Sequence, residues 1–547
     1  SPLGALVVNS AGTTRFDGAV SAASVTTDEP GSTLLNGNVT TTSGAQVYHD
    51  IVEVRSGITL GTANGAVTFD KTVDSQTGET NALTVSTGSG NVTFTDVVGG
   101  TTALGAVTVN STGTTKFNAA VTAASVATNA GGTTQINGNI TTTGTQTYND
   151  AVELQAPLAF ATTNSAVTFG GTVDSQVTGG VGEANPLTVN AGSGDVSFMG
   201  VVGGAVKGAP GAIVVNSSGT TLFNAAVTAA SVTTDAPGKT QLGGNITTTG
   251  AQHFQDDVEV LTGVSLATTN SAVTFDKAVD SAAGQTAALT VGSGSADVTF
   301  SGLVGGTTAL GALAVDSTGT TLFADAVHAA SVTTNVGGTT RLGGNVTTSG
   351  AQTYNDAVEL LTGVTVTTTN SAVSFGGTLN SEAGEGNNLT VVAGSGDVGF
   401  TGAVGGAANG RLGTLTVTSA HDVTANAISA GALVQTAGSG TTTLNGAVDT
   451  DTADGQTTSQ PYAAGLTTAA PNQAPVITAA SPKLFELEDY RALPGVRDLS
   501  MIFEGPKYTK WRSLRDSEDS RFLVLTCPRS LARLPYGAAT KPVEEFD

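Results

Sequence analysis

The chain of 547 residues carries a formal net charge of −23, yet only 12% of its residues are charged, 5% are aromatic and 73 are glycine. So few large side chains cannot fill several wide globular cores, whereas the 39% hydrophobic fraction argues against disorder over the whole chain. From Pro471 onward acidic and basic side chains are equal in number, so the negative charge lies before that point. This charge disfavours nucleic acid and anionic membranes as partners of the acidic part.

No run of about 18 apolar residues is present, so no transmembrane segment is expected. The sequence opens inside a repeat, because Pro2-Leu3-Gly4 matches Ala103-Leu104-Gly105. We therefore expect the chain to be an internal slice of a longer one.

The first strong pattern is a repeated segment, Gly4–Val20, which recurs as Gly105–Val121, Gly211–Val227 and Gly311–Val327, with a degenerate copy from Gly413. Repetition at a period of about 100 residues indicates a repeat array. The array is predicted to span residues 1–450, with repeats that start at 4, 105, 211 and 311 and a partial repeat at 413.

Each repeat divides into short β-branched segments separated by Gly, Asn, Ser or Asp. This pattern predicts strands joined by tight turns, with no helical period. In the second repeat the expected strands are Ala106–Asn110, Thr114–Val121, Ala124–Thr128, Thr133–Asn137, Asn139–Thr143, Gln146–Val152, Ala166–Val173, Leu187–Asn190 and Asp195–Met199.

Two all-β architectures fit these strands: a parallel β-helix (β-solenoid), or a string of β-sandwiches of about 100 residues each. The solenoid is favoured, because strand-sized pieces recur without a long crossover loop and no linker separates the repeats. The predicted fold class is therefore all-β, a β-solenoid built from repeats of about 100 residues, with a small α/β carboxy-terminal fragment.

Aromatic residues hold three regular positions in the array, which predicts stacked core residues. They are Phe16, Phe117, Phe223 and Phe323; Phe69, Phe169, Phe275 and Phe375; and Tyr48, Tyr148, Phe254 and Tyr354. Phe254 in the place of Tyr suggests that the ring matters more than the hydroxyl. Asn36-Gly37 and Asn137-Gly138 are expected in turns that need a positive φ.

One acidic pair recurs: Asp50, Asp150, Asp256 and Asp356 each stand three residues before a glutamate, Glu53, Glu153, Glu259 and Glu359. These aspartates are candidate ligands for weakly bound calcium, although a solvated turn is the favoured interpretation.

The four histidines are His49, His253, His328 and His421, and none has a second ligand nearby in the sequence at metal-binding spacing. We find no catalytic motif and expect no catalytic residue, metal or cofactor.

The composition changes after the array. Residues 451–473 are polar and small and are predicted to be a linker. In residues 474–547, a helix is expected at Pro506–Asp516 and a buried strand at Arg521–Thr526.

Short sequence motifs in the array resemble those of bacterial adhesins of the filamentous-haemagglutinin and autotransporter kind. These motifs are Thr141–Asp150, Thr163–Gly171 and Leu104–Gly113. The resemblance covers about 450 residues and implies a solenoid stalk at the cell surface or outside the cell, with host or biofilm glycans or proteins as partners.

The tail resembles a different family. Ala474–Phe485, Tyr508–Phe522 and Leu531–Gly537 are similar to an interior slice of the large contractile-sheath subunit of type VI secretion, the TssC family; Cys527 departs from its pattern. This resemblance implies binding to the small sheath subunit and a cytoplasmic location.

Three functions follow from these observations. The main prediction is a non-enzymatic adhesin stalk fused to a sheath-like fragment. The alternatives are a type VI sheath component and a β-helix polysaccharide-active enzyme. The join near Gln473 is either a genuine fusion or the product of a fused or mis-assembled reading frame.

Overall fold

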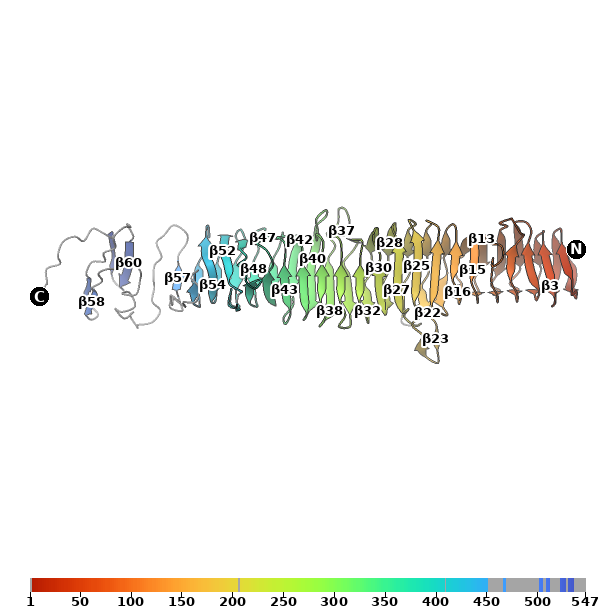
Figure 1. Ribbon diagram of the computed structural model, residues 1–547, viewed down its shortest axis with the longest axis horizontal. Helices are drawn as coiled ribbons and strands as arrows, with labels where there is room; N and C mark the ends of the chain where they lie inside the picture. The colour runs from red at the N-terminus through yellow and green to blue at the C-terminus, as the bar shows by residue number, and fades with distance from the viewer. Residues whose placement is uncertain are drawn as a thin grey trace. The chain divides into compact units, whose positions relative to one another are not determined.

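The computed structural model describes residues 2–204, 207–408 and 410–450, and the backbone of five later strands at 466–468, 501–504, 508–511, 522–527 and 530–535. The chain divides into an N-terminal unit, Ser1–Arg341, and a C-terminal unit, Leu342–Asp547. All regular elements of the described residues are strands, and parallel strands stack into about 22 turns of β-solenoid (Figure 1). The predicted solenoid is confirmed, and the sandwich alternative is wrong because the array strands pair in parallel.

Each turn of the chain places its strands beside those of the turn before. In the second repeat, Val107 pairs with Val126 and Thr134 with Val152, both in parallel. Apart from a small hairpin described below, the strands of this repeat are β13 (Leu104–Ser111), β14 (Thr114–Phe117), β15 (Val121–Thr128), β16 (Thr133–Ile136), β17 (Ile140–Thr142), β18 (Gln146–Tyr148), β19 (Ala151–Leu154), β20 (Leu158–Thr162), β21 (Val167–Phe169), β22 (Val173–Ser175), β25 (Leu187–Gly192) and β26 (Val196–Phe198). Each of these strands except β20 overlaps a predicted strand, but β18 and β19 were predicted as a single strand, as were β21 and β22.

Side chains alternate between the interior and the surface along each strand, as the pleat of a strand requires. In β17, Ile140 and Thr142 are buried and Thr141 is exposed. The interior of each solenoid turn is therefore narrow, because each strand that borders it contributes only one layer of inward-pointing side chains.

The aromatic residues form ladders in the interior. Tyr48, Phe69, Phe94 and Phe117 come from β6 (Gln46–Tyr48), β9 (Val67–Phe69), β12 (Val92–Phe94) and β14, and their rings stack at centroid distances of 5.2, 4.9 and 5.1 Å. The predicted core role is confirmed. The third rung, which is Phe94, Phe198, Phe300 or Phe400 in successive ladders, was missed as a regular position.

The Asn-Gly turns differ from the prediction. Neither Gly37 nor Gly138 lies in the left-handed region of φ. A Cβ atom at Gly138 would instead stand 2.2 Å from the carbonyl carbon of Ala119, and one at Gly37 would stand 2.3 Å from that of Gly18. Glycine is needed here because the backbone of one turn lies directly on that of the preceding turn.

Of two segments predicted in the tail, one differs from expectation and one agrees with it. Strand β59 (Tyr508–Trp511) pairs antiparallel with β58 (Met501–Glu504), so the helix predicted at Pro506–Asp516 is wrong over Tyr508–Trp511; its other residues lie outside the described part. The predicted strand near Arg521–Thr526 is confirmed as β60 (Phe522–Cys527), which pairs with β61 (Ser530–Pro535).

The segment predicted as a linker contains one described strand. This strand, β57 (Leu466–Thr468), pairs antiparallel with β55 (Thr442–Leu444) in the C-terminal unit. Elsewhere, a small hairpin of β23 (Val177–Thr178) and β24 (Val181–Gly182) stands off the solenoid turns of the N-terminal unit (Figure 1).

Candidate functional site

The four aspartates proposed as weak calcium ligands are buried, with only 2–3% of their surface exposed. In the first repeat, the carboxylate of Asp50 accepts hydrogen bonds from the hydroxyls of Thr27 (2.8 Å) and Thr33 (2.9 Å). The expectation of a solvated turn is wrong, because each aspartate points into the interior at the start of a strand.

The same arrangement recurs in the second and third repeats. Asp150 accepts from Thr128 (2.7 Å) and Thr134 (2.8 Å), and Asp256 accepts from Thr234 and Thr240. Burial raises the pKa of both aspartates above the ordinary value, although the threonine hydrogen bonds act in the opposite direction. These carboxylates hold neighbouring turns together.

The glutamates of the acidic pairs lie on the outer side of the same strands. Glu153 accepts hydrogen bonds from Gln135 (3.0 Å) and from the Lys207 ammonium (3.1 Å). Burial alone would raise the pKa of Glu153, but these contacts outweigh it and lower the pKa. Aspartate and glutamate of a pair therefore face opposite sides of the strand and do not converge on one ion; the calcium proposal remains a prediction.

Two histidines contact a carboxylate of the next turn, which sequence spacing did not reveal. His49 pairs with Asp70, and the Nε2 atom of His253 lies 2.8 Å from Asp276. Asp-Lys follows the ring at 70–71 and 276–277, whereas Gly-Gly stands at 170–171 and 376–377. The first and third repeats therefore share a histidine next to Tyr48 or Phe254 and an Asp-Lys pair, both of which the second and fourth repeats lack at these positions. This alternation is the sequence signal that could have located both histidine–aspartate pairs.

A third histidine lies in an exposed cluster of the C-terminal unit. The Nδ1 atom of His421 is 3.2 Å from Asp397 and 3.5 Å from Asp422, and ligand atoms of all three residues lie within 4.8 Å of one another. Both carboxylates also accept backbone N–H groups, from Asp422 and Thr441 respectively. This cluster could hold a divalent cation, but its hydrogen bonds already serve the stacking of turns.

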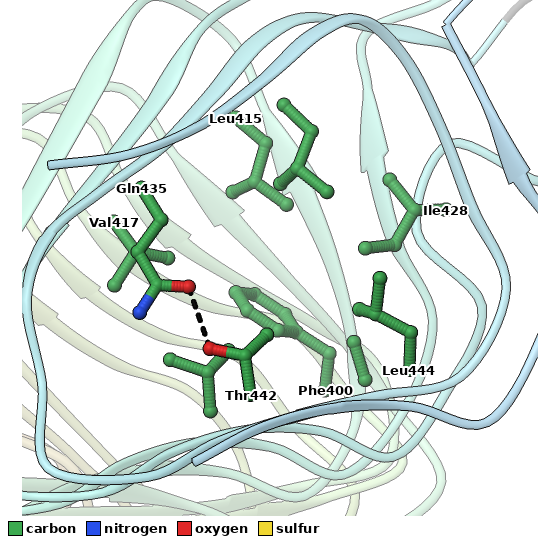
Figure 2. Close-up of a pocket in the computed structure, with 10 residues that line it drawn as sticks. Phe400, Leu415, Val417, Ile428, Gln435, Thr442 and Leu444 are labelled. Atoms are coloured by element: carbon green, nitrogen blue, oxygen red, sulfur yellow. Dashed lines mark hydrogen bonds between the residues drawn. The ribbon is translucent and has the colours of Figure 1, made fainter. Parts of the chain in front are cut away.

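The last described turns of the array line a partly open, mainly apolar cavity of about 220 Å³ (Figure 2). The ring of Phe400 lies on one side of it, and Gln435 and Thr442 bond to each other at its edge, with 2.7 Å between their oxygens. Nearby, Arg411 binds Ser429, the Ala430 carbonyl and Asp449, which fixes strand β56 (Val448–Asp449) to its neighbour.

Among the described residues, no helix has the length and apolar character needed to cross a bilayer.

Comparison with known proteins gives matches in the tail. Residues 462–547 match the family model described as EvpB/VC_A0108, tail sheath N-terminal domain. Over 73 residues the chain is 59% identical to the type VI secretion system sheath protein TssC1 of Pseudomonas aeruginosa, which is 13% of this chain and 15% of that relative. The chain thus spans less than a fifth of the length of this relative.

No solved structure matches the chain. Ala474–Phe485, Tyr508–Phe522 and Leu531–Gly537, which carry the resemblance to the sheath family, all lie within the matched residues 462–547, so the predicted similarity of the tail is confirmed. The described array is a β-solenoid, and residues 462–547 of the chain, which follow it, are similar to type VI sheath subunits.

Proposed function

We propose that this chain is a non-enzymatic structural protein of the type VI secretion sheath, in which the solenoid is a long spacer and residues 462–547 bind other sheath subunits. The observation that carries this proposal is the 59% identity to TssC1 over 73 residues. This identity favours the sheath component, which the sequence analysis gave as an alternative, over the adhesin stalk, which was its main prediction. We further propose that the chain is located in the cytoplasm.

The array itself supports a structural role. Its interior is occupied by stacked rings and aliphatic side chains, and its recurrent aspartates are bound by threonine hydroxyls of neighbouring turns. These groups stabilise the stacking of turns. We accordingly propose three parts: a structural array at 1–450, a linker at 451–473 and a sheath-like part at 474–547.

The test is a direct binding measurement. The full chain and a version that ends at residue 450 are purified and titrated against a purified small sheath subunit of a type VI secretion system. We expect the full chain to bind and the shortened chain not to bind. Equal binding by both, or by neither, would contradict the proposal.

The second candidate function is an adhesin stalk, favoured by the parallel solenoid of the array and by exposed threonines such as Thr141. It predicts that antibodies against residues 1–450 label intact cells of the source organism. Labelling only after lysis favours the sheath component instead. Sequencing across the Gln473 region of the source DNA shows in addition whether both parts belong to one gene.

A further inference from the structure

The aromatic ladders of the N-terminal unit have four rungs. The fourth ring is Phe117 in one ladder and Phe223 in the next, at centroid distances of 5.1 and 5.2 Å from the third. Each fourth ring is followed by an aliphatic residue on the next turn, Ile136 or Leu242. The fourth ring is therefore enclosed between an aromatic and an aliphatic side chain.

The ladder of the C-terminal unit lacks this ring. Tyr354, Phe375 and Phe400 stack as the first three rungs, and the residue that pairs with Phe400 on the next turn is Ala425. Ala425 is fully buried and pairs in turn with Leu444. The aromatic ring of Phe400 and the aliphatic side chain of Leu444 are thus both present, but the side chain between them, that of Ala425, is a single methyl group.

The cavity of about 220 Å³ lies at this position. Leu415, Ile428 and Leu444 surround a common space with the ring of Phe400 on one side (Figure 2). Among the described residues no charged side chain lines it, and the two polar side chains that do, Gln435 and Thr442, are bonded to each other. Such a lining favours an uncharged apolar occupant, because a charged group would lose its hydration without a partner.

We propose that this cavity, which takes the place of the fourth ladder ring, binds a small uncharged aromatic molecule with one ring stacked on Phe400. The internal repeats carry the argument, since they show that a phenyl ring fits between the same two kinds of neighbour at a spacing of about 5 Å. The volume is sufficient, because an apolar cavity of about 150 Å³ binds benzene. This inference does not depend on the proposed sheath function.

The test uses fluorobenzene as the probe and the full chain as the protein. Titration followed by ¹⁹F NMR is expected to show saturable binding at one site. Ala425→Phe supplies the missing ring and is expected to weaken binding by about tenfold or more. The matched control is Thr424→Phe, on the exposed side of the same strand β53 (Val423–Ala425), which is expected to bind as the parent does.

A converse variant keeps the proposal falsifiable if Ala425→Phe fails to fold. Phe117→Ala removes a fourth ring from the N-terminal unit and is expected to add a second binding site. Absence of binding to the parent chain overturns the proposal, as does undiminished binding to folded Ala425→Phe. Equal affinity for cyclohexane would overturn the stacked geometry, because that molecule fills volume without a flat face.

Discussion

The phenol of Tyr148 donates a hydrogen bond to Gln146 Oε1, 3.1 Å away, inside the solenoid, and the Gln146 amide donates to the carbonyls of Ile140 and Ala161. The glutamine thus satisfies two backbone acceptors and the tyrosine satisfies the glutamine. In the third repeat Phe254 replaces the tyrosine, and Gln252 Oε1 is buried without a hydrogen-bond partner. The hydroxyl therefore has a function that the sequence pattern had discounted.

Phe254→Tyr is expected to stabilise the third repeat by about 1 kcal/mol, because it supplies a donor to a buried acceptor. Hydrogen exchange of the amides in β33 (Gln252–Phe254) and β36 (Val273–Phe275) measures this locally and should slow. The reverse change, Tyr148→Phe, should accelerate exchange in the second repeat. Unchanged exchange in both variants would contradict the argument.

The carboxylates of β19 and its preceding turn should respond to pH in opposite directions. The pKa of Asp150 is raised on folding, so its contribution to stability falls as pH rises from about 4 through the raised value. Asp150→Asn should therefore gain stability relative to the parent between pH 4 and 7, measured by urea unfolding.

Glu153→Gln provides the contrast. The folded pKa of Glu153 is lowered, so the parent keeps this stabilisation at neutral pH and loses it as pH falls through the lowered value. The variant should lose stability relative to the parent as pH rises from 3 to 7. The same sign of change in both variants would show that the assigned environments are wrong.

At the scale of strands and turns, the spacing of the chain is set by backbone contact. Gly138 and Gly244 lie so close to the preceding turn that a Cβ atom would stand 2.2 Å from a carbonyl carbon. The sequence shows that glycine recurs at this position of each repeat, but a need for positive φ and a close approach of two backbones would both select glycine. Only the stacking of turns separates the two causes.

Gly138→Ala is expected to destabilise the second repeat by about 1–3 kcal/mol, as overpacking of an interior does. Gly263→Ala is the matched control, because a Cβ atom there meets nothing within 4 Å. Urea unfolding should show a loss for the first variant and almost none for the second. A loss of similar size in both would point to backbone conformation as the cause.

The solenoid and most strands were predictable because the repeats, the period-2 alternation and the turn residues can be read directly from the sequence. The burial of Asp50 was not, because its hydroxyl partners, Thr27 and Thr33, lie on other strands. The partnership of His253 with Asp276 was missed for the same reason. Contacts between turns depend on register, and register appears only when the turns are stacked.

At the scale of the whole chain, stability is expected to arise from contacts between neighbouring turns. The array should therefore not need the sheath-like tail in order to fold. A chain that ends at residue 450 is expected to keep the β-type circular dichroism of the full chain and to melt within a few degrees of it. Loss of the folded signal on truncation would contradict this view of the array.

The alternation of repeats and the recurrence of the ring ladders have a genetic consequence. Gly105 and Gly311 occupy the same place in strands β13 and β40 (Leu310–Ser317), so a copied or deleted repeat begins and ends at the same point of the winding. Unequal recombination between copies would then change the length of the protein by whole turns and leave no mismatched seam in the core.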